Sequence, residues 1–195
     1  MLALAFAGCA SAAEPADDRS CDVYRAFYVA VAPETTGTLA PQTRRPRWIK
    51  DWLHGPDTFE RDTGEMQTTE VEGEAFEFPV REQFEVETDA FFDVVRDGPA
   101  RAIQHCFGAD SDAAFFSGSV AQLAARSARS QELRYPELPP SMWRLSRIGF
   151  SADWRYALLY ADLECHGWCG GGGFYLFERD QAGWRLIGDK WVWVA

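Results

Sequence analysis

The C-terminal part of the chain carries the pattern that most restricts its fold, a series of segments rich in aromatic and β-branched residues. We expect four strands here, over residues 142–151, 154–165, 172–180 and 183–195. The turns between them are short, and strands joined by short turns pair as antiparallel neighbours. The sequence therefore predicts an antiparallel β-meander over 142–195.

The second of these strands is apolar on both faces. Side chains alternate between the faces of a strand, and here the even positions from Tyr156 to Tyr160 and the odd positions from Ala157 to Ala161 are all apolar. Such a strand is buried on both sides, so other elements must cover the sheet. The spacing of apolar residues upstream predicts helices for this role, over 20–32, 88–107 and 119–133. We therefore predict an α+β domain in which N-terminal helices pack on a curved C-terminal meander.

The other segments indicate the domain organisation. A length of 195 residues fits a single domain. We expect a signal or lipobox segment over 1–13, a tether over 14–19 and one domain over 20–195, in which the Pro- and Thr-rich stretch 33–47 is a flexible loop. Between Asp57 and Val80, glutamates partly alternate with apolar residues, and this alternation predicts an edge or half-exposed strand with a solvated acidic face.

The first residues are typical of the end of a secretory signal. They are uncharged up to Glu14 and pass from an apolar run to small residues. The run is shorter than the roughly 20 residues that span a bilayer. The piece FAGC, ending at Cys9, resembles the lipobox of bacterial lipoproteins, which implies a diacylated Cys9 as membrane anchor and mature N-terminus. A cut after Ala12 would instead give a secreted protein, and a buried N-terminal helix is the remaining interpretation of the apolar run.

Four cysteines remain once Cys9 is lipidated or removed. They are Cys21, Cys106, Cys165 and Cys169. An even number of cysteines in an oxidising compartment predicts two disulfides. Three pairings are open, and loop geometry favours Cys165 with Cys169 and Cys21 with Cys106.

The stretch CHGWCGGGG allows other chemistry. Cys165, His166 and Cys169 could ligate zinc with His105 or Cys106 as a fourth ligand, but the second cysteine pair that such sites usually have is missing. A thioredoxin-like redox site needs C-x-x-C at a helix N-terminus, and a phosphate loop needs Lys followed by Ser or Thr, and neither is present. We therefore expect no metal and no cofactor, but a disulfide-tied hairpin whose glycines permit positive φ and a β-bulge.

Catalytic motifs are scarce. The three histidines, His54, His105 and His166, are scattered, and neither G-x-S-x-G nor H-E-x-x-H occurs. Asp162 and Glu164 share one face of the second strand, a spacing that two-carboxylate acid–base chemistry could use. Such pairs are more often a solvated strand end, so an enzyme is the less favoured interpretation.

Charge and resemblance complete the functional prediction. A net charge of −11 lacks the basic surface that nucleic acid requires. The region 147–195 resembles the C-terminal part of exported bacterial proteins of unknown function that share a cysteine–glycine hairpin, and its GWRLIG and WVWV segments are similar to the last strands of NTF2-like cone folds, an alternative fold with a cavity between helices and sheet.

We therefore predict an uncharacterised exported envelope protein, periplasmic and lipid-anchored through Cys9 or otherwise secreted. Its disulfide-stabilised domain would bind a protein partner or a small ligand. The alternative is an envelope enzyme, possibly metal-dependent, with a pocket between helices and sheet that uses Asp162, Glu164 or His105, or a metal at Cys165 and Cys169.

Overall fold

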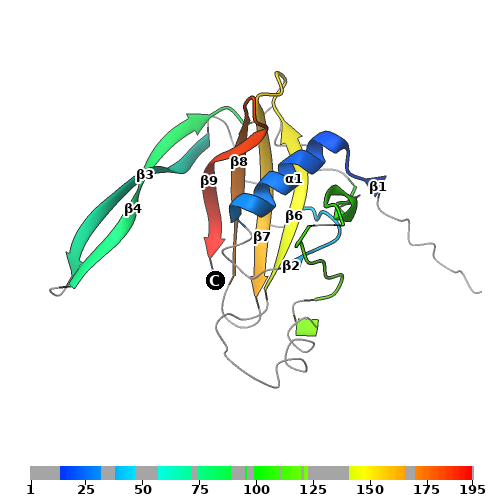
Figure 1. Ribbon diagram of the computed structural model, residues 1–195, viewed down its shortest axis with the longest axis horizontal. Coiled ribbons are helices and arrows are strands. Elements are labelled where there is room, and N and C mark those ends of the chain that lie inside the picture. Colours follow the sequence, from blue (N-terminus) through cyan, green and yellow to red (C-terminus); the bar gives the residue numbers. More distant parts are fainter. Residues whose placement is uncertain are drawn as a thin grey trace, which may run out of the picture.

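The computed structural model describes residues 14–31, 38–46, 57–71, 74–88, 95, 99–109, 111–119, 121–122, 141–165 and 170–194. Most of this backbone is β-strand (Figure 1). The segment 1–13 and the histidines His54 and His166 lie outside the described residues.

Seven strands of the described chain form one mixed sheet in the order β2-β6-β7-β8-β9-β3-β4. Neighbouring strands are antiparallel, except that β2 runs parallel to β6. A second, small sheet pairs β1 with β5 in parallel. The strands are β1 (Glu14–Pro15), β2 (Thr38–Leu39), β3 (Asp57–Val71), β4 (Glu74–Val86), β5 (Arg101–Ala102), β6 (Ser141–Phe150), β7 (Tyr156–Cys165), β8 (Gly170–Arg179) and β9 (Trp184–Val194).

Helix α1 (Asp18–Val31) covers one face of this sheet (Figure 1). Asp17 caps its start, because Asp17 Oδ1 accepts a hydrogen bond of 2.8 Å from the Ser20 N–H. This bond satisfies one of the amides of the first turn that have no partner within the helix. The apolar stripe of the helix faces the sheet, and the Phe27 ring packs edge-on against Trp143 and Tyr175, with centroids 5.3 and 5.1 Å apart. The helix therefore docks through aromatic contacts onto β6 and β8.

The central strands are buried on both sides. On the α1 side, Ala157 and Leu159 of β7 join the core cluster that contains Phe27. On the other side, Leu158 and Tyr160 pack in a second cluster with Phe59 of β3. The alternation of apolar residues in β7 thus supplies two cores, one on each face of a single sheet.

The predicted fold class is wrong, although the four C-terminal strands lie where the sequence places them. Among the described residues, α1 is accompanied by a short 3-10 helix, η2 (Gln104–Cys106), and by helical positions at 95 and 121–122, so a single long helix, and not a set of helices, covers one face of the sheet. Within the helix expected over 88–107, residues 101–102 form β5 and 104–106 form η2, and most of the helix expected over 119–133 lies outside the described residues. The second face is covered by side chains from the root of the β3–β4 hairpin, Phe59, Phe84 and Val86. Strands rather than helices cover the second face because the segment with alternating glutamates forms two paired strands that extend the sheet beyond β9.

The β3–β4 hairpin projects far from the body (Figure 1). Strand β3 pairs with β9 at a single position, Glu60 with Asp189, and from there the two strands leave the sheet together. Phe59 at the root is fully buried, whereas Phe78 farther out is 52 % exposed. We call residues 57–86 the acidic arm. The single strand predicted over 57–80 is thus the larger part of a two-stranded ribbon.

Candidate functional site

The Cys21–Cys106 disulfide joins the first turn of α1 to η2. The two cysteines are 2 % and 0 % exposed, so the bridge lies within the core. His105 lies beside it, with Nε2 3.5 Å from Cys21 Sγ and 2.9 Å from the carbonyl oxygen of Ala16. A carbonyl only accepts hydrogen bonds, so Nε2 must carry the proton. Because both sulfurs are bonded to each other, they are not free metal ligands, and this cluster is a structural link.

The other cysteines are only partly described. Cys165 ends β7 and is disulfide-bonded, and its bonding partner lies outside the described residues. Cys9 and Cys169 also lie outside them. The lipidation of Cys9 and the pairing of Cys165 with Cys169 therefore remain predictions. A thiolate of Cys165 is not available to hold a metal while the disulfide is intact. Among the described residues, no helix is long and apolar enough to span a membrane.

Asp162 is held in a polar cluster on the face of the sheet opposite α1. Its Oδ1 accepts a hydrogen bond from the Tyr160 hydroxyl at 2.5 Å and from the Trp193 Nε1–H at 3.1 Å. Burial raises the pKa of this carboxyl group, although both hydrogen bonds act in the opposite direction. The hydrogen bonds thus fix Asp162 in place without fully compensating the loss of hydration.

Glu164 is the second carboxylate of the predicted pair. It forms ion pairs with Arg44 Nη1 at 2.7 Å and with Arg144 Nε at 2.8 Å, and these contacts tie the end of β7 to β6 and to the chain after β2. Asp162 and Glu164 therefore do share one region of β7, as the spacing predicts. His105 lies at the disulfide beside α1, on the other side of the sheet, so the structure does not bring it together with the two carboxylates.

The glycine run at the start of β8 makes room for large side chains. A Cβ atom on Gly172 would overlap Asp162 Oδ1, Trp193 Nε1 and the Tyr160 hydroxyl, and one on Gly171 would lie 2.7 Å from the Trp191 ring. The expected irregularity is present, because the β8–β9 register shifts between Gly172 and Gly173. Glycine is required at positions 171 and 172 because side chains of the neighbouring strands β7 and β9 occupy the space that a Cβ atom would fill.

This register shift also separates the two C-terminal tryptophans. Trp191 packs against Tyr175 on the α1 side, with ring centroids 6.4 Å apart. Trp193 instead reaches Tyr160 and Asp162 on the opposite side, donating to the Tyr160 hydroxyl at 3.0 Å. Residues two apart normally share a face, so the bulge reverses the direction that simple alternation predicts.

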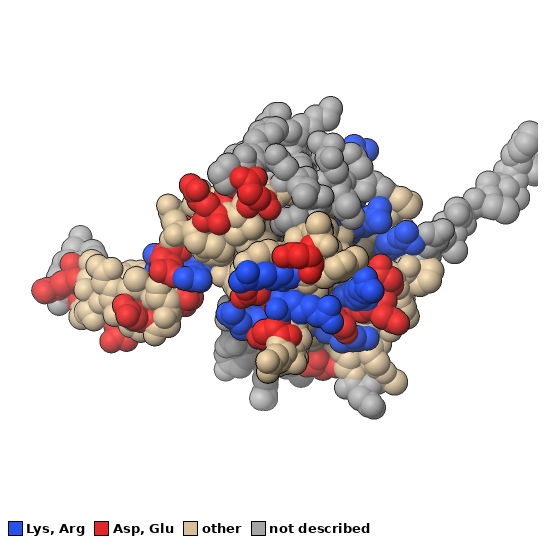
Figure 2. All heavy atoms as spheres, turned by 90° about the horizontal axis from the view of Figure 1, so that it is seen from above, with Lys and Arg blue, Asp and Glu red and all other residues tan. Residues whose placement is uncertain are grey.

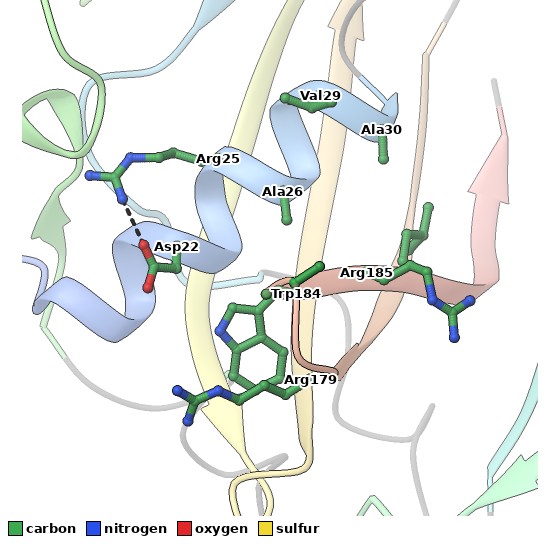
Figure 3. Close-up of a pocket in the computed structure, with 11 residues that line it drawn as sticks. Asp22, Arg25, Ala26, Val29, Ala30, Arg179, Trp184 and Arg185 are labelled. Atoms are coloured by element: carbon green, nitrogen blue, oxygen red, sulfur yellow. Dashed lines mark hydrogen bonds and ion pairs between the residues drawn. The ribbon is translucent and has the colours of Figure 1, made fainter.

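An open groove of about 630 Å³ lies between α1 and the start of β9 (Figure 3). The outer face of the helix forms one wall, and the β8–β9 turn with the first residues of β9 forms the other. We call it the arginine groove; it is lined by Asp22, Arg25, Ala26, Val29 and Ala30 of α1, by Arg179, and by residues 182–186.

The arginine groove combines apolar walls with cations. Val29 is 74 % exposed, and the Trp184 ring lies below the helix with the Arg179 guanidinium 5.9 Å from its centroid (Figure 3). Arg25 is paired with Asp22 at 2.7 Å and donates from Nε to the Cys106 carbonyl oxygen, and Arg185 is paired with Glu178 at 3.3 Å and with Asp180 at 3.9 Å. Trp and Arg are the residues that most often dominate binding energy at protein interfaces. The groove can therefore hold a ligand that presents both apolar surface and negative charge.

Charge is distributed unevenly over the molecule. The acidic arm contains ten acidic and two basic residues, a net charge of −8 out of −11 for the whole chain. Figure 2 shows basic side chains interspersed with acidic ones over the body at the end where the β6–β7 and β8–β9 turns lie, and mainly acidic side chains on the projecting arm. The rest of the chain is therefore close to neutral, and the arm carries most of the net negative charge.

The arginine groove was missed at the level of sequence. Arg179 and Arg185 flank a short turn, and Ala26, Val29 and Ala30 follow helical spacing, so both walls carry a detectable signal. What the sequence does not contain is the information that this helix face and this turn lie side by side.

No known protein family, curated protein or solved structure matches the chain.

Proposed function

We propose that this chain is an exported, non-enzymatic protein of the bacterial cell envelope that binds an anionic, partly apolar partner in the arginine groove. The observation that carries the binding role is the groove itself, in which Arg179 and Arg185 lie at the wall opposite the exposed Val29 of α1 and beside Trp184. Export and anchoring through Cys9 are supported by the apolar opening of the sequence, by its FAGC segment and by the even number of remaining cysteines.

The groove favours binding over catalysis because of its side chains. It contains no histidine or cysteine, and its one carboxylate, Asp22, is paired with Arg25. Acid–base chemistry needs a group whose proton can be exchanged with a bound substrate. Arginine stays protonated at all ordinary pH values and therefore serves as a fixed cation.

A second candidate function is an acid–base enzyme that uses Asp162 and Glu164. One observation favours it, the burial that raises the pKa of Asp162, because catalytic carboxyl groups often have perturbed values. However, Glu164 is engaged by two arginines, and neither carboxylate lines the arginine groove. This candidate predicts a loss of a hydrolytic or isomerase activity in Asp162→Asn without a loss of stability.

Binding in the groove is tested with anilinonaphthalene sulfonate, a fluorescent anion with an apolar ring system. Titration of dilute protein should give saturable fluorescence. The dissociation constant of the dye should rise about tenfold or more in Arg179→Ala/Arg185→Ala, since each contact to a charged group is worth about 1.5–3 kcal/mol. The matched control is Arg19→Ala/Arg155→Ala, which removes two arginines that do not line the groove. Equal binding by all three proteins would overturn the proposed binding site.

The cellular part of the proposal is tested by the intact mass of the mature protein, purified without reductant. Acyl chains on Cys9 and the loss of one hydrogen for each of four thiols would support a lipid-anchored protein with two disulfides. A chain that retains its first residues would contradict export.

A further inference from the structure

We propose that the occupant of the arginine groove is the acidic arm of a second copy of this chain. The inference rests on the proposed binding role of the groove and names the partner. Its basis is the complementarity of two surfaces of the same molecule, one a groove with arginines and exposed apolar walls, the other a projecting ribbon with carboxylates and exposed apolar side chains.

The arm has both features that the groove requires. Met66 and Phe78 are 58 % and 52 % exposed, so the arm presents apolar surface to solvent as well as carboxylates. In the cross-strand register, Met66 pairs with Pro79, Glu70 with Ala75 and Thr68 with Glu77. Paired residues share a face, so Met66, Glu70 and Glu77 lie on the same side of the arm. One face thus offers Met66 with two carboxylates farther toward the tip, whereas Phe78, which pairs with Gln67, lies on the other face.

The dimensions of the two surfaces also agree. The helix wall of the groove runs from Asp22 to Ala30, which is about 12 Å at the rise of an α-helix. The arm segment from Met66 to Glu70 extends about 13 Å at the rise of a β-strand. A two-stranded ribbon can therefore place its apolar and acidic side chains along the length of the groove.

The partner must be another molecule. The arm projects away from the body, beyond the edge of the sheet, and so points away from the groove of its own chain (Figure 1). A contact between different patches of identical chains either adds copies head to tail or, when two copies exchange arms, closes into a symmetric dimer. In both cases the assembly grows with protein concentration and weakens with salt, because charges drive the encounter.

Sedimentation equilibrium tests this proposal directly. The average mass of the full chain should rise between about 5 µM and about 500 µM protein in about 50 mM salt, and fall again in about 500 mM salt. Glu70→Lys/Glu77→Lys in the arm and Arg179→Glu/Arg185→Glu in the groove should each raise the apparent dissociation constant about tenfold or more, because each places like charges against each other.

Mixing the two charge-reversed proteins is the decisive experiment. The reversed arm then meets the reversed groove, and the native arm meets the native groove, so assembly should return although neither protein assembles alone. Return of assembly also shows that both variants are folded. In a third variant, Asn-Gly replaces residues 63–80, so that a two-residue turn connects the paired residues Asp62 and Arg81 and the distal arm is absent. This variant should stay monomeric.

Three outcomes would overturn the inference. They are a wild-type chain that stays monomeric throughout the range, assembly that survives both reversals, and a mixture that does not reassemble. If the wild-type chain stays monomeric but still binds anilinonaphthalene sulfonate through Arg179 and Arg185, the groove serves another anionic partner and the proposed function stands. If the monomeric wild-type chain also fails to bind the dye through Arg179 and Arg185, both the self-assembly and the proposed binding function are overturned.

Discussion

The central strands and the acidic arm have the same backbone geometry and use it in opposite ways. Strands β7 and β8 bury both faces, so that Leu158 and Leu159, which point in opposite directions, are each 0 % exposed. In the distal half of the arm, the side chains that the structure describes at 65–70, 74–75 and 77–79 are exposed, and many of them are acidic. Burial of apolar area is the main source of folding free energy, at about 25 cal/mol per Å². The body should therefore hold most of the stability, while the arm is available for contacts with other molecules.

An isolated two-stranded ribbon is at best marginally stable in water. The arm is held by its root, where Phe59 is buried and Lys190 Nζ forms an ion pair of 2.7 Å with Asp57. Its acidic side chains also protect the unpaired edge strand β4 from aggregation, since repulsion between like charges disfavours edge-to-edge pairing. The comparison shows that one chain can form strands for two purposes, and the following variants separate them.

Removal of the Cys21–Cys106 disulfide should have the largest effect. The bridge closes a loop with a sequence separation of 85 residues, and Cys21→Ala/Cys106→Ala should lower the free energy of unfolding by about 4 kcal/mol. Denaturant unfolding without reductant measures this. A loss below about 1 kcal/mol would mean that the body does not depend on the link between α1 and η2.

Truncation of aromatic side chains at the two ends of the arm should give unequal losses. Phe59→Ala removes a fully buried ring at the root and should cost about 3–4 kcal/mol. Phe78→Ala, with the same chemical change at a site that is 52 % exposed, should cost about 1 kcal/mol or less. Equal losses in the denaturant midpoint would show that the distal arm contributes to the core after all.

A methyl group on Gly172 should disturb the cluster around Asp162. Gly172→Ala would force the Asp162, Tyr160 and Trp193 side chains apart, and we expect a loss of about 2 kcal/mol. Gly108→Ala is the matched control, because nothing lies within 4 Å of the added carbon. If thermal unfolding of the two variants coincides, the contact of these side chains with β8 is not a packing constraint.

The smallest effect concerns the pH dependence of stability. Burial raises the folded-state pKa of Asp162 above the unfolded value of about 3.9. The contribution of Asp162 protonation to the free energy of unfolding is therefore complete below the unfolded pKa and is lost as pH rises through the folded-state pKa. Asp162→Asn keeps an oxygen for Tyr160 and Trp193 but carries no charge. The variant should therefore be at least as stable as the wild type at pH about 7, and its advantage should disappear at pH about 3.5.

Glu164→Gln provides the opposite control, because it loses ion pairs with Arg44 and Arg144 and should be less stable than the wild type at neutral pH by about 1 kcal/mol. Unfolding in denaturant at several pH values distinguishes the two. An Asp162→Asn variant that is clearly less stable at neutral pH would show that the negative charge itself is needed by the fold.

Several elements could be predicted from sequence because local patterns specify them. The four C-terminal strands, the helix predicted over 20–32 and observed as α1 (Asp18–Val31), and the burial of both faces of β7 follow from periodicity and turn residues. The disulfide between Cys21 and Cys106 is the pairing that loop geometry favours. Asp162 and Glu164 share a face because two residues separate them on a strand.

Other elements depend on contacts between distant segments, which periodicity does not encode. Glutamates alternating with apolar residues predict a strand near Phe59, but only the packed sheet decides that two strands extend it and that their root covers the second face. The opposite directions of Trp191 and Trp193 depend on a bulge that the partner strand β8 imposes. The arginine groove exists only because α1 lies beside the β8–β9 turn. By itself, the sequence determined the four C-terminal strands and which cysteines can pair, since these are local or covalent properties. The tertiary structure alone decided which surfaces meet, because that depends on the balance of packing over the whole chain.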